Sequence, residues 1–507
     1  MRSGSVACVT FAALSVVVAG AGGGSSAAGQ CGPDQEKQKL GGALPYDAFG
    51  SSVSVSGNVA LVGAIADNQG AGSAYVYRYD GTSWVQEQKL VAADGASPDL
   101  FGWSASVSGD VAVVGNNPPF PGVAGAAYVF RHDGTSWVQE QKLLDGATGD
   151  GFGYAASVSG NVAVIGAPGI PCPPCGSLPG AAYVFRHDGA NWVQEQKLEG
   201  ANPYYLDWFG RSVSVSGNVA AVLAPSEASA YVFRYDGTRW VEEQTLATPD
   251  AADVSVSGNV VVIGAPGDVA AYVFRHDGTR WVPEQRLATD DATSADCYGC
   301  SVSVSGNVAV VGASGDDQNA GSAHVFGYDG ASWVQEQALT AADAAANDFF
   351  GFRVSASGTF AVIGAVGDDS FTGAAYVFGA PAPAWSSYGS GWPGTNGVPS
   401  LTLGGDPVLC TAATLDLENS LGADTIAVLV FVLTRTEQPT IYDGHLLVVP
   451  TLVFLLAVPA SGLSLGGDLP CDLILCGDSE YLQALEVDAG ASKGVSFTPG
   501  LQLVLGS

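Results

Sequence analysis

Residues 49–90 read FGSSVSVSGNVALVGAIADNQGAGSAYVYRYDGTSWVQEQKL, and variants of this stretch recur along the chain. The copies are spaced by roughly 40 to 57 residues, an interval typical of stacked or radial repeat folds. In the first copy, residues 51–56 alternate Ser and Val and residues 59–63 are apolar. Residues 73–79 and 84–90 follow, separated by a turn with the hairpin signal Asp-Gly. Each copy therefore predicts four antiparallel strands.

The seventh copy ends early, at Phe378, before the segment that carries a Trp in the other copies. The missing segment has a counterpart at the start of the chain, where residues 36–40 read EKQKL. An N-terminal strand that completes the last unit closes a ring and leaves no open sheet edge. We therefore predict an all-β fold, a seven-bladed β-propeller with four antiparallel strands per blade and an N-terminal strand that closes the last blade.

Composition changes outside the repeats predict the other parts of the chain. Residues 1–28 combine Arg2, an apolar run and small residues, the layout of a secretory signal peptide. We place the propeller at residues 31–380, a linker at 381–387 and a small β-sandwich-like domain at 388–507. The C-terminal strands are predicted at residues 425–433, 446–457, 481–487 and 501–505. No apolar run is long enough to suggest a transmembrane anchor.

The chain carries 49 acidic and 18 basic residues, a formal net charge of −31. Nucleic acids and anionic membranes require basic surfaces, so we expect no nucleic-acid partner. High solubility outside the cell explains the charge most simply, and attraction of cations is the alternative. The predicted localisation is secreted or cell surface.

Nine cysteines occur, and eight remain if the signal peptide is removed. In an oxidising compartment, closely spaced cysteines favour local disulfides. We expect such bonds among the pairs Cys172 and Cys175, Cys297 and Cys300, and Cys471 and Cys476. A zinc site made from the two C-x-x-C pairs is the alternative, but these pairs lie in different repeats.

The antiparallel strand order separates the loops of a blade into two sets on opposite faces. The Ser-Gly-Asn and Asp-Gly-Thr-Ser turns are nearly invariant and share one face, whereas variable loops share the other. Function normally occupies the variable loops of a rigid scaffold. On that face, aromatic side chains beside Asp and Asn suit sugar binding, although such a loop can also pack on its own side chains. The candidate ligand-binding residues are Trp103, Phe120, Tyr204, Tyr205 and Trp208.

The pattern FG, SVSVSGNVAVIGAPG and AAYVF is clearest at Phe152-Gly153 and Gly166-Ala167-Pro168. It resembles the FG-GAP repeats of integrin α-subunit propellers and, more closely, those of secreted bacterial proteins. The resemblance covers about residues 49–378 and implies a seven-bladed propeller that binds proteins or glycans and is not usually catalytic. In integrins, calcium occupies an acidic loop between the FG and GAP strands. Here that connection is only Ser56-Gly57-Asn58, so the integrin calcium site is not expected.

Acidic residues do occur in the next connection of several repeats. A calcium ion needs six to eight oxygen ligands, and these carboxylates could supply part of such a shell. Solvated turn residues are the commoner explanation. No cofactor is expected, and calcium remains a weakly supported candidate at Asp67, Asp316, Asp317, Asp368 and Asp369.

Motifs for catalysis are absent: the chain has no HExxH, no GxSxG and no P-loop. The repeated Glu87, Glu140, Glu195 and Glu336 are expected to be solvated or to protect the outer sheet edge. The predicted function is a non-catalytic, secreted or cell-surface binding or adhesion protein with an extracellular protein or glycan as partner. The alternatives are a secreted hydrolase or lyase with a site in the central propeller pocket, and a structural envelope component.

Overall fold

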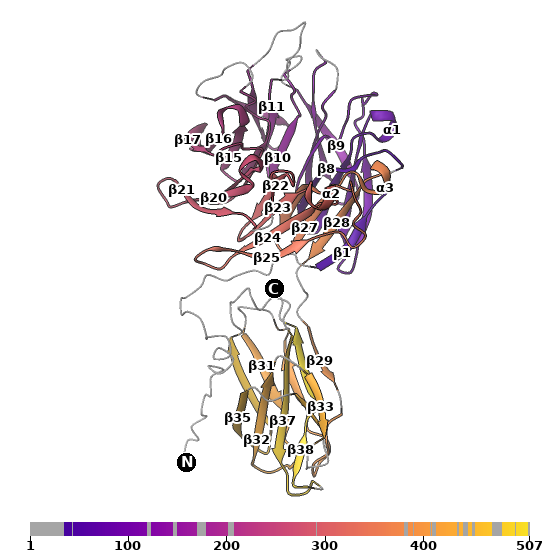
Figure 1. Cartoon of the computed structure of the whole chain (residues 1–507), viewed down its shortest axis with the longest axis vertical. Helices are drawn as coiled ribbons and strands as arrows, with labels where there is room; N and C mark the ends of the chain where they lie inside the picture. The colour runs from indigo at the N-terminus through magenta and orange to yellow at the C-terminus, as the bar shows by residue number, and fades with distance from the viewer. Residues whose placement is uncertain are drawn as a thin grey trace. The chain divides into compact units, whose positions relative to one another are not determined.

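The computed structural model describes residues 35–42, 44–118, 123–144, 150–169, 179–200, 207–289, 292–379, 384–388, 390–405, 407, 412–432, 435–439, 445–448, 452–468, 479–491 and 493–504. These residues form two compact units, one with strands β1 to β28 and one with strands β29 to β39 (Figure 1). The predicted signal peptide at residues 1–28 lies outside the described residues. None of the helices within the described ranges is long and apolar enough to cross a membrane.

The first unit consists of seven four-stranded antiparallel sheets, one for each repeat. The first three blades contain β2 (Phe49–Ser56), β3 (Val59–Ala64), β4 (Ser73–Tyr79) and β5 (Trp84–Leu90); β6 (Ser104–Ser108), β7 (Val111–Gly115), β8 (Ala127–His132) and β9 (Trp137–Leu143); and β10 (Ala155–Ser159), β11 (Val162–Ala167), β12 (Ala181–His187) and β13 (Trp192–Leu198). The fourth and fifth blades contain β14 (Val213–Ser216), β15 (Val219–Ala224), β16 (Ser229–Tyr235) and β17 (Trp240–Ala247); and β18 (Asp253–Ser257), β19 (Val260–Ala265), β20 (Ala270–His276) and β21 (Trp281–Leu287). The sixth and seventh blades contain β22 (Tyr298–Ser305), β23 (Val308–Ala313), β24 (Ser322–Tyr328) and β25 (Trp333–Leu339); and β26 (Phe350–Ser357), β27 (Phe360–Ala365), β28 (Ala374–Gly379) and β1 (Gln35–Leu40). Short helical turns connect the second and third strands of five blades: α1 (Asp67–Gly70), η2 (Pro225–Glu227), η3 (Pro266–Asp268), α2 (Asp316–Asn319) and α3 (Asp368–Phe371).

The N-terminal strand β1 completes the seventh blade, as predicted. It pairs antiparallel with β28, with Lys39 opposite Tyr376 and Leu40 opposite Ala375. Figure 1 shows indigo β1 beside orange β28, although the two are separated by most of the propeller sequence. The first and last blades are thereby joined by one continuous chain, and the seven sheets form a closed propeller with four antiparallel strands per blade.

The glycines of the FG and GA segments allow neighbouring blades to approach backbone to backbone. A Cβ on Gly63 of the first blade would lie 2.2 Å from the carbonyl oxygen of Gly102 in the second. A Cβ on Gly364 of the seventh blade would lie 2.3 Å from the carbonyl oxygen of Gly50 in the first. Side chains cannot be accommodated at these distances, so Gly is required at these two contacts between blades.

Serine side chains join the innermost strands around the ring. The Oγ atoms of Ser54 and Ser56 accept hydrogen bonds from the backbone N–H groups of Val107 (3.0 Å) and Gly109 (3.1 Å) in the next blade. The same two bonds occur at every blade interface; the accepting residues are Ser54, Ser56, Ser106, Ser108, Ser157, Ser159, Ser214, Ser216, Ser255, Ser257, Ser303, Ser305, Ser355 and Ser357. We call this set the serine ladder. It provides hydrogen-bond acceptors for backbone N–H groups on the inner edge of each blade, where no further strand is present to pair with them.

The outer strands contain a second inter-blade contact. Gln88 of the first blade donates to the carbonyl of Trp137 (2.7 Å) and accepts from its N–H (2.8 Å). The indole of Trp137 donates to Glu87 (2.9 Å), which also pairs with Arg78 (2.9 Å). Glu87 lies at an exposed position of β5, in agreement with the expected solvated or edge-protecting role, and its carboxylate also connects two blades.

The same contact recurs at other interfaces. The indoles of Trp192 and Trp240 donate to Glu140 (3.0 Å) and Glu195 (2.9 Å) of the preceding blades. Glu140 is exposed and Glu195 is half-buried, so the expected solvated or edge-protecting position is compatible with this additional contact. Each of these carboxylates stabilises a neighbouring blade, and the repeated Trp residues are buried parts of the scaffold.

The C-terminal unit is a small β-sandwich. Its strands are β29 (Ala384–Tyr388), β30 (Leu401–Gly404), β31 (Ala412–Leu417), β32 (Thr425–Val432), β33 (Arg435–Pro439), β34 (His445–Val448), β35 (Leu452–Val458), β36 (Leu463–Asp468), β37 (Ser479–Val487), β38 (Val495–Phe497) and β39 (Gly500–Val504). A sheet of order β29-β39-β37-β32-β35, with β38 on β37, and a sheet of order β30-β31-β36 share one apolar core. Leu403 and Leu415 from the second sheet pack there with Leu429 and Leu501 from the first.

Candidate functional site

In five blades (the second, third, fourth, sixth and seventh), a tight turn surrounds the pair of an aromatic residue and a glycine at the start of the inner strand. In the second blade, Leu100 has a left-handed backbone (φ 55°), and the N–H of Trp103 donates to its carbonyl at 3.2 Å. In the fourth blade, Trp208 (φ 58°) and Arg211 make the same bond at 3.1 Å. We call this element the FG turn; its ends are the residue before the aromatic residue and the residue after the glycine. The turn brings the side chains at its two ends close together.

The aromatic residue and the glycine of the FG turn are used for packing. Phe101 is completely buried and lies edge-on against Tyr128, with ring centroids 5.4 Å apart. A Cβ on Gly102 would lie 2.4 Å from the carbonyl oxygen of Ser73 in the preceding blade. The two ends of the turn are therefore the positions that are free to vary.

The FG turns surround the propeller axis on one face. The serine ladder pairs the inner strands in the same direction around the whole ring, so all of them begin on this face. We call it the FG face, and the face with the Ser-Gly-Asn and Asp-Gly-Thr-Ser turns the hairpin face. The residues after the glycines form a ring at the centre of the FG face: Ser51, Trp103, Tyr154, Arg211, Cys300 and Phe352.

On the second, third and fourth blades, this ring carries a connected set of aromatic and cationic side chains. The rings of Trp103 and Tyr154 lie 5.5 Å apart. The guanidinium of Arg211 lies 5.7 Å from the centroid of the Tyr154 ring and 4.9 Å from that of Trp208. All four side chains are half-buried, so each still exposes part of its surface. We call Trp103, Tyr154, Trp208 and Arg211 the aromatic array.

The array contains two of the five ligand-binding candidates. Trp103 and Trp208 are distant in sequence, and Tyr154 and Arg211 connect them. Phe120, Tyr204 and Tyr205 lie outside the described residues. Sequence reasoning missed Tyr154 and Arg211. Their signal was the position directly after the repeated Phe-Gly pair, which differs in every copy.

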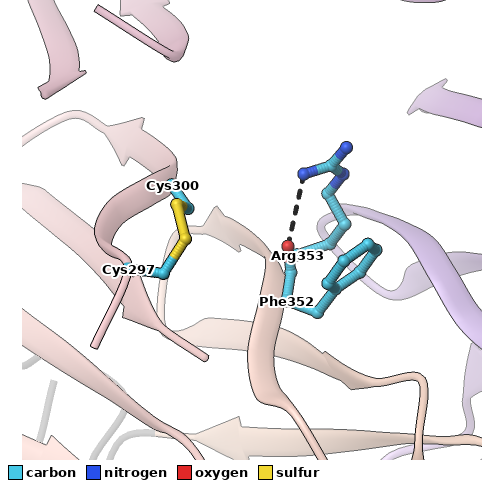
Figure 2. The surroundings of a disulfide bond; sticks show 4 residues. All are labelled: Cys297, Cys300, Phe352 and Arg353. Atoms are coloured by element: carbon cyan, nitrogen blue, oxygen red, sulfur yellow. Dashed lines mark hydrogen bonds between the residues drawn. A yellow bond between two sulfur atoms is a disulfide. The ribbon is translucent and has the colours of Figure 1, made fainter. Parts of the chain in front are cut away.

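The sixth and seventh blades carry a different group on the same ring. A disulfide joins Cys297 to Cys300, the two ends of the sixth FG turn, where the fourth blade has Trp208 and Arg211. Figure 2 shows Phe352 and Arg353 beside this bond. The guanidinium of Arg353 lies 5.0 Å from the Phe352 ring centroid and donates to the Phe352 carbonyl at 3.3 Å. The cysteine candidates Cys172, Cys175, Cys471 and Cys476 lie outside the described residues.

Two calcium candidates are paired with lysines. Asp67 is buried, accepts a hydrogen bond from the Tyr75 hydroxyl (2.8 Å) and lies 2.5 Å from Lys89 Nζ. Burial would raise the pKa of Asp67, but the hydrogen bonds from Lys89 and Tyr75 hold it below its ordinary value. Asp368 lies 2.8 Å from Lys39 Nζ. The lysines supply the positive charge that a calcium ion would otherwise bring.

The remaining calcium candidates do not assemble into a site. Asp316 is half-buried, and Asp317, which follows it in α2, is exposed. Asp369, which follows Asp368 in α3, is also exposed. Within the described ranges, no three His, Cys, Asp or Glu side chains are arranged to hold a metal ion.

A family profile described as FG-GAP repeat matches residues 40–77, 84–130, 137–185, 281–326 and 333–378. Most of these segments begin at the outer strand of one blade and end in the third strand of the next. A search of curated proteins finds no match.

Solved structures with a similar arrangement have low sequence identity. A chain of the mitotic checkpoint complex is 11% identical, with 68% of this chain and 94% of that chain covered and a TM-score of 0.45. The β-propeller domain of Myceliophteria thermophila Cps50 (Swd1) is 9% identical, with 68% and 99% covered and a TM-score of 0.44. The Pseudomonas aeruginosa periplasmic gluconolactonase PpgL is 15% identical, with 57% and 85% covered and a TM-score of 0.40. The first unit is thus a β-propeller that contains five FG-GAP repeat segments.

Proposed function

We propose that the protein is a secreted or cell-surface binding protein whose ligand contacts the aromatic array at the centre of the FG face. The observation that carries this proposal is the connection of Trp103, Tyr154, Arg211 and Trp208 across three blades. Trp, Tyr and Arg are the residues most enriched among those that dominate binding energies.

The scaffold holds the array in a defined geometry. Each of its side chains belongs to an FG turn closed by a backbone hydrogen bond, and the buried Phe101, Phe152 and Phe209 anchor these turns. A pre-organised surface loses less conformational entropy on binding than a flexible loop does. The array is therefore suited to recognition of a ligand with flat apolar surfaces.

Two features support a location outside the cell. The first 28 residues have the layout of a signal peptide, and a disulfide joins Cys297 to Cys300. Disulfides persist mainly in oxidising compartments. An extracellular protein or glycan is accordingly the proposed partner class.

A binding screen of the full-length chain against glycans and extracellular proteins tests the proposal. The variants Trp103→Ala and Trp208→Ala should each weaken the binding found about 10-fold or more, because each removes a large aromatic surface. Trp385→Ala is the matched control, since Trp385 lies on β29 of the C-terminal unit and is 37% exposed. Binding that is unchanged in both array variants would contradict the proposal.

A further inference from the structure

The arginines of the propeller divide into two groups. Eight of the ten lie within 4.0 Å of a carboxylate: Arg78, Arg131, Arg186, Arg234, Arg239, Arg275, Arg280 and Arg286. Arg211 and Arg353 make no ion pair with any residue that the structure describes. This is notable in a chain with 49 acidic residues, where carboxylates are abundant.

Arg211 belongs to the central ring of the FG face, and Arg353 directly follows Phe352, another member of that ring. Arg211 follows the Phe-Gly pair of the fourth blade directly, and Arg353 is two positions after the Phe-Gly pair of the seventh. Arg211 is positioned by the rings of Tyr154 and Trp208, and Arg353 by its bond to the Phe352 carbonyl. A guanidinium has five N–H donors, so most donors of both groups remain available to a ligand.

Asp253, the first residue of the inner strand of the fifth blade, makes no ion pair with either Arg211 or Arg353 among the described contacts. Asp253 Oδ1 accepts hydrogen bonds from the Ser212 hydroxyl (2.7 Å) and the Val254 N–H (3.0 Å). Its Oδ2 accepts from the Val302 N–H at 2.9 Å. Asp253 therefore stands where the sixth blade has Ser301, whose hydroxyl accepts from the Val354 N–H at 3.1 Å. Both oxygens of Asp253 are occupied by the scaffold.

We infer that the ligand at this site is an acidic oligosaccharide with carboxylate groups, an inference that rests on the proposed function. The guanidinium groups of Arg211 and Arg353 bind the carboxylates, since their planar forks match that geometry. The rings of Trp103, Tyr154 and Trp208 stack on the apolar faces of the sugar rings. An acidic peptide carries its carboxylates on flexible stems and lacks a regular flat surface for the array.

Titration of the full-length chain with a defined oligogalacturonate and with its methyl ester tests this inference. The two probes share the same sugar rings, but the ester has no charge. The acid form should bind at least about 10-fold more tightly than the ester, and its affinity should fall as salt is added. Equal affinity for the two forms, or no binding of the acid form, would overturn the inference.

A matched pair of double variants locates the effect. R211Q/R353Q should weaken binding of the acid form about 10-fold or more, and should weaken binding of the ester much less. R239Q/R280Q changes the net charge equally, but its side chains are 74% and 73% exposed in turns of the hairpin face, so its affinity should match wild type. Equal loss in both double variants would show a general charge effect and contradict the site. Thermal melting of each variant checks that it is folded.

Three further outcomes separate this inference from the proposed function. In the first, poly-glutamate at the same concentration of charge displaces oligogalacturonate from the protein. That result would overturn the inference of an oligosaccharide ligand and favour an acidic polypeptide. If Trp103→Ala weakens binding of a neutral glycan or a protein while R211Q/R353Q has no effect, the proposed function stands and the acidic ligand is wrong. If neither the array variants nor the arginine variants alter any binding, both are wrong.

Discussion

At the residue scale, Phe101 and Gly102 show how the repeated Phe-Gly pair separates structural from variable positions. The Phe101 ring is fully buried, and Gly102 lies against the backbone of the preceding blade. Neither can be exchanged for another residue type without disturbing an interface. The next residue, Trp103, is under no such constraint, so the pair places a variable side chain at the centre of the face.

The close contact between glycines can be tested directly. Gly63→Ala should destabilise the propeller by about 3 kcal/mol, because its Cβ would lie 2.2 Å from the Gly102 carbonyl oxygen and the blades would have to separate. Gly41→Ala is the control, since a Cβ there has no neighbour within 4 Å. Urea unfolding measures both. A Gly63→Ala protein as stable as the Gly41→Ala protein would contradict the close approach.

At the element scale, the inner strands are edge strands of their blades, and the serine ladder explains why Ser alternates with a small apolar residue, Val or Ala, along them. The Ser side chains bind the next blade, whereas Val53 and Val55 pack in a core with Val362 and Val377 of the preceding one. Both faces of the strand are thus used at an interface. The alternation serves ring closure as well as strand formation.

Loss of a single ladder bond should have a measurable cost. Ser54→Ala leaves the buried N–H of Val107 without its acceptor, and the free energy of unfolding should fall by about 1–3 kcal/mol. Ser136→Ala is the comparison, because the Ser136 hydroxyl makes no hydrogen bond to the described residues; it should change stability by less than about 0.5 kcal/mol. Chemical denaturation distinguishes the two. Equal stability of both variants would argue against a structural role of the ladder.

The elements of the propeller could be predicted from sequence to within a few residues. The predicted ranges 73–79 and 84–90 coincide with β4 and β5, and the closure by β1 followed from the incomplete seventh copy. Partners across blades could not be predicted, because pattern analysis treats one strand at a time. The bond between Trp137 and Glu87 joins residues 50 positions apart. The aromatic array could not be predicted for the same reason, because Tyr154 and Arg211 meet Trp103 and Trp208 only when the FG turns of three blades lie together.

In the C-terminal unit, the predictions were less complete. The predicted run 446–457 is divided between β34 and β35, and β30, β31 and β36 were not anticipated. These strands belong to a sandwich without internal repeats. No second copy was present to confirm a weak pattern.

At the scale of the whole molecule, repeated carboxylates make stability dependent on pH. Burial would raise the pKa of Glu195, but hydrogen bonds from Arg186 and the Trp240 indole hold it below its ordinary value of 4.5. In the turns of the hairpin face, the Thr135 hydroxyl lowers the pKa of Asp133 to about 2. Because these pKa values are lower in the folded state, their contribution is complete above pH 4.5 and is lost as the pH falls toward 2.

Thermal melting as a function of pH tests this dependence. We expect the melting temperature to fall as the pH decreases from 4.5 toward 2. Glu195→Gln should lower the melting temperature at pH 7 and reduce this fall, because the variant has no carboxylate to titrate there. Glu199→Gln is the control, since Glu199 is 47% exposed and its ion pair with Lys197, the one it makes among the described residues, lies on the surface. A variant Glu195→Gln with the wild-type slope would contradict the assignment.

The central claim is that ligand binds at the FG turns of the propeller, and hydrogen–deuterium exchange of the full-length chain with and without oligogalacturonate tests it most directly. The account predicts slower exchange in peptides covering residues 97–105, 150–156, 207–213 and 349–355, which contain the array and Arg353. Peptides covering the hairpin-face turns, such as residues 79–84 and 235–240, should be unchanged. Protection confined to the hairpin face or to residues 384–504 would contradict it.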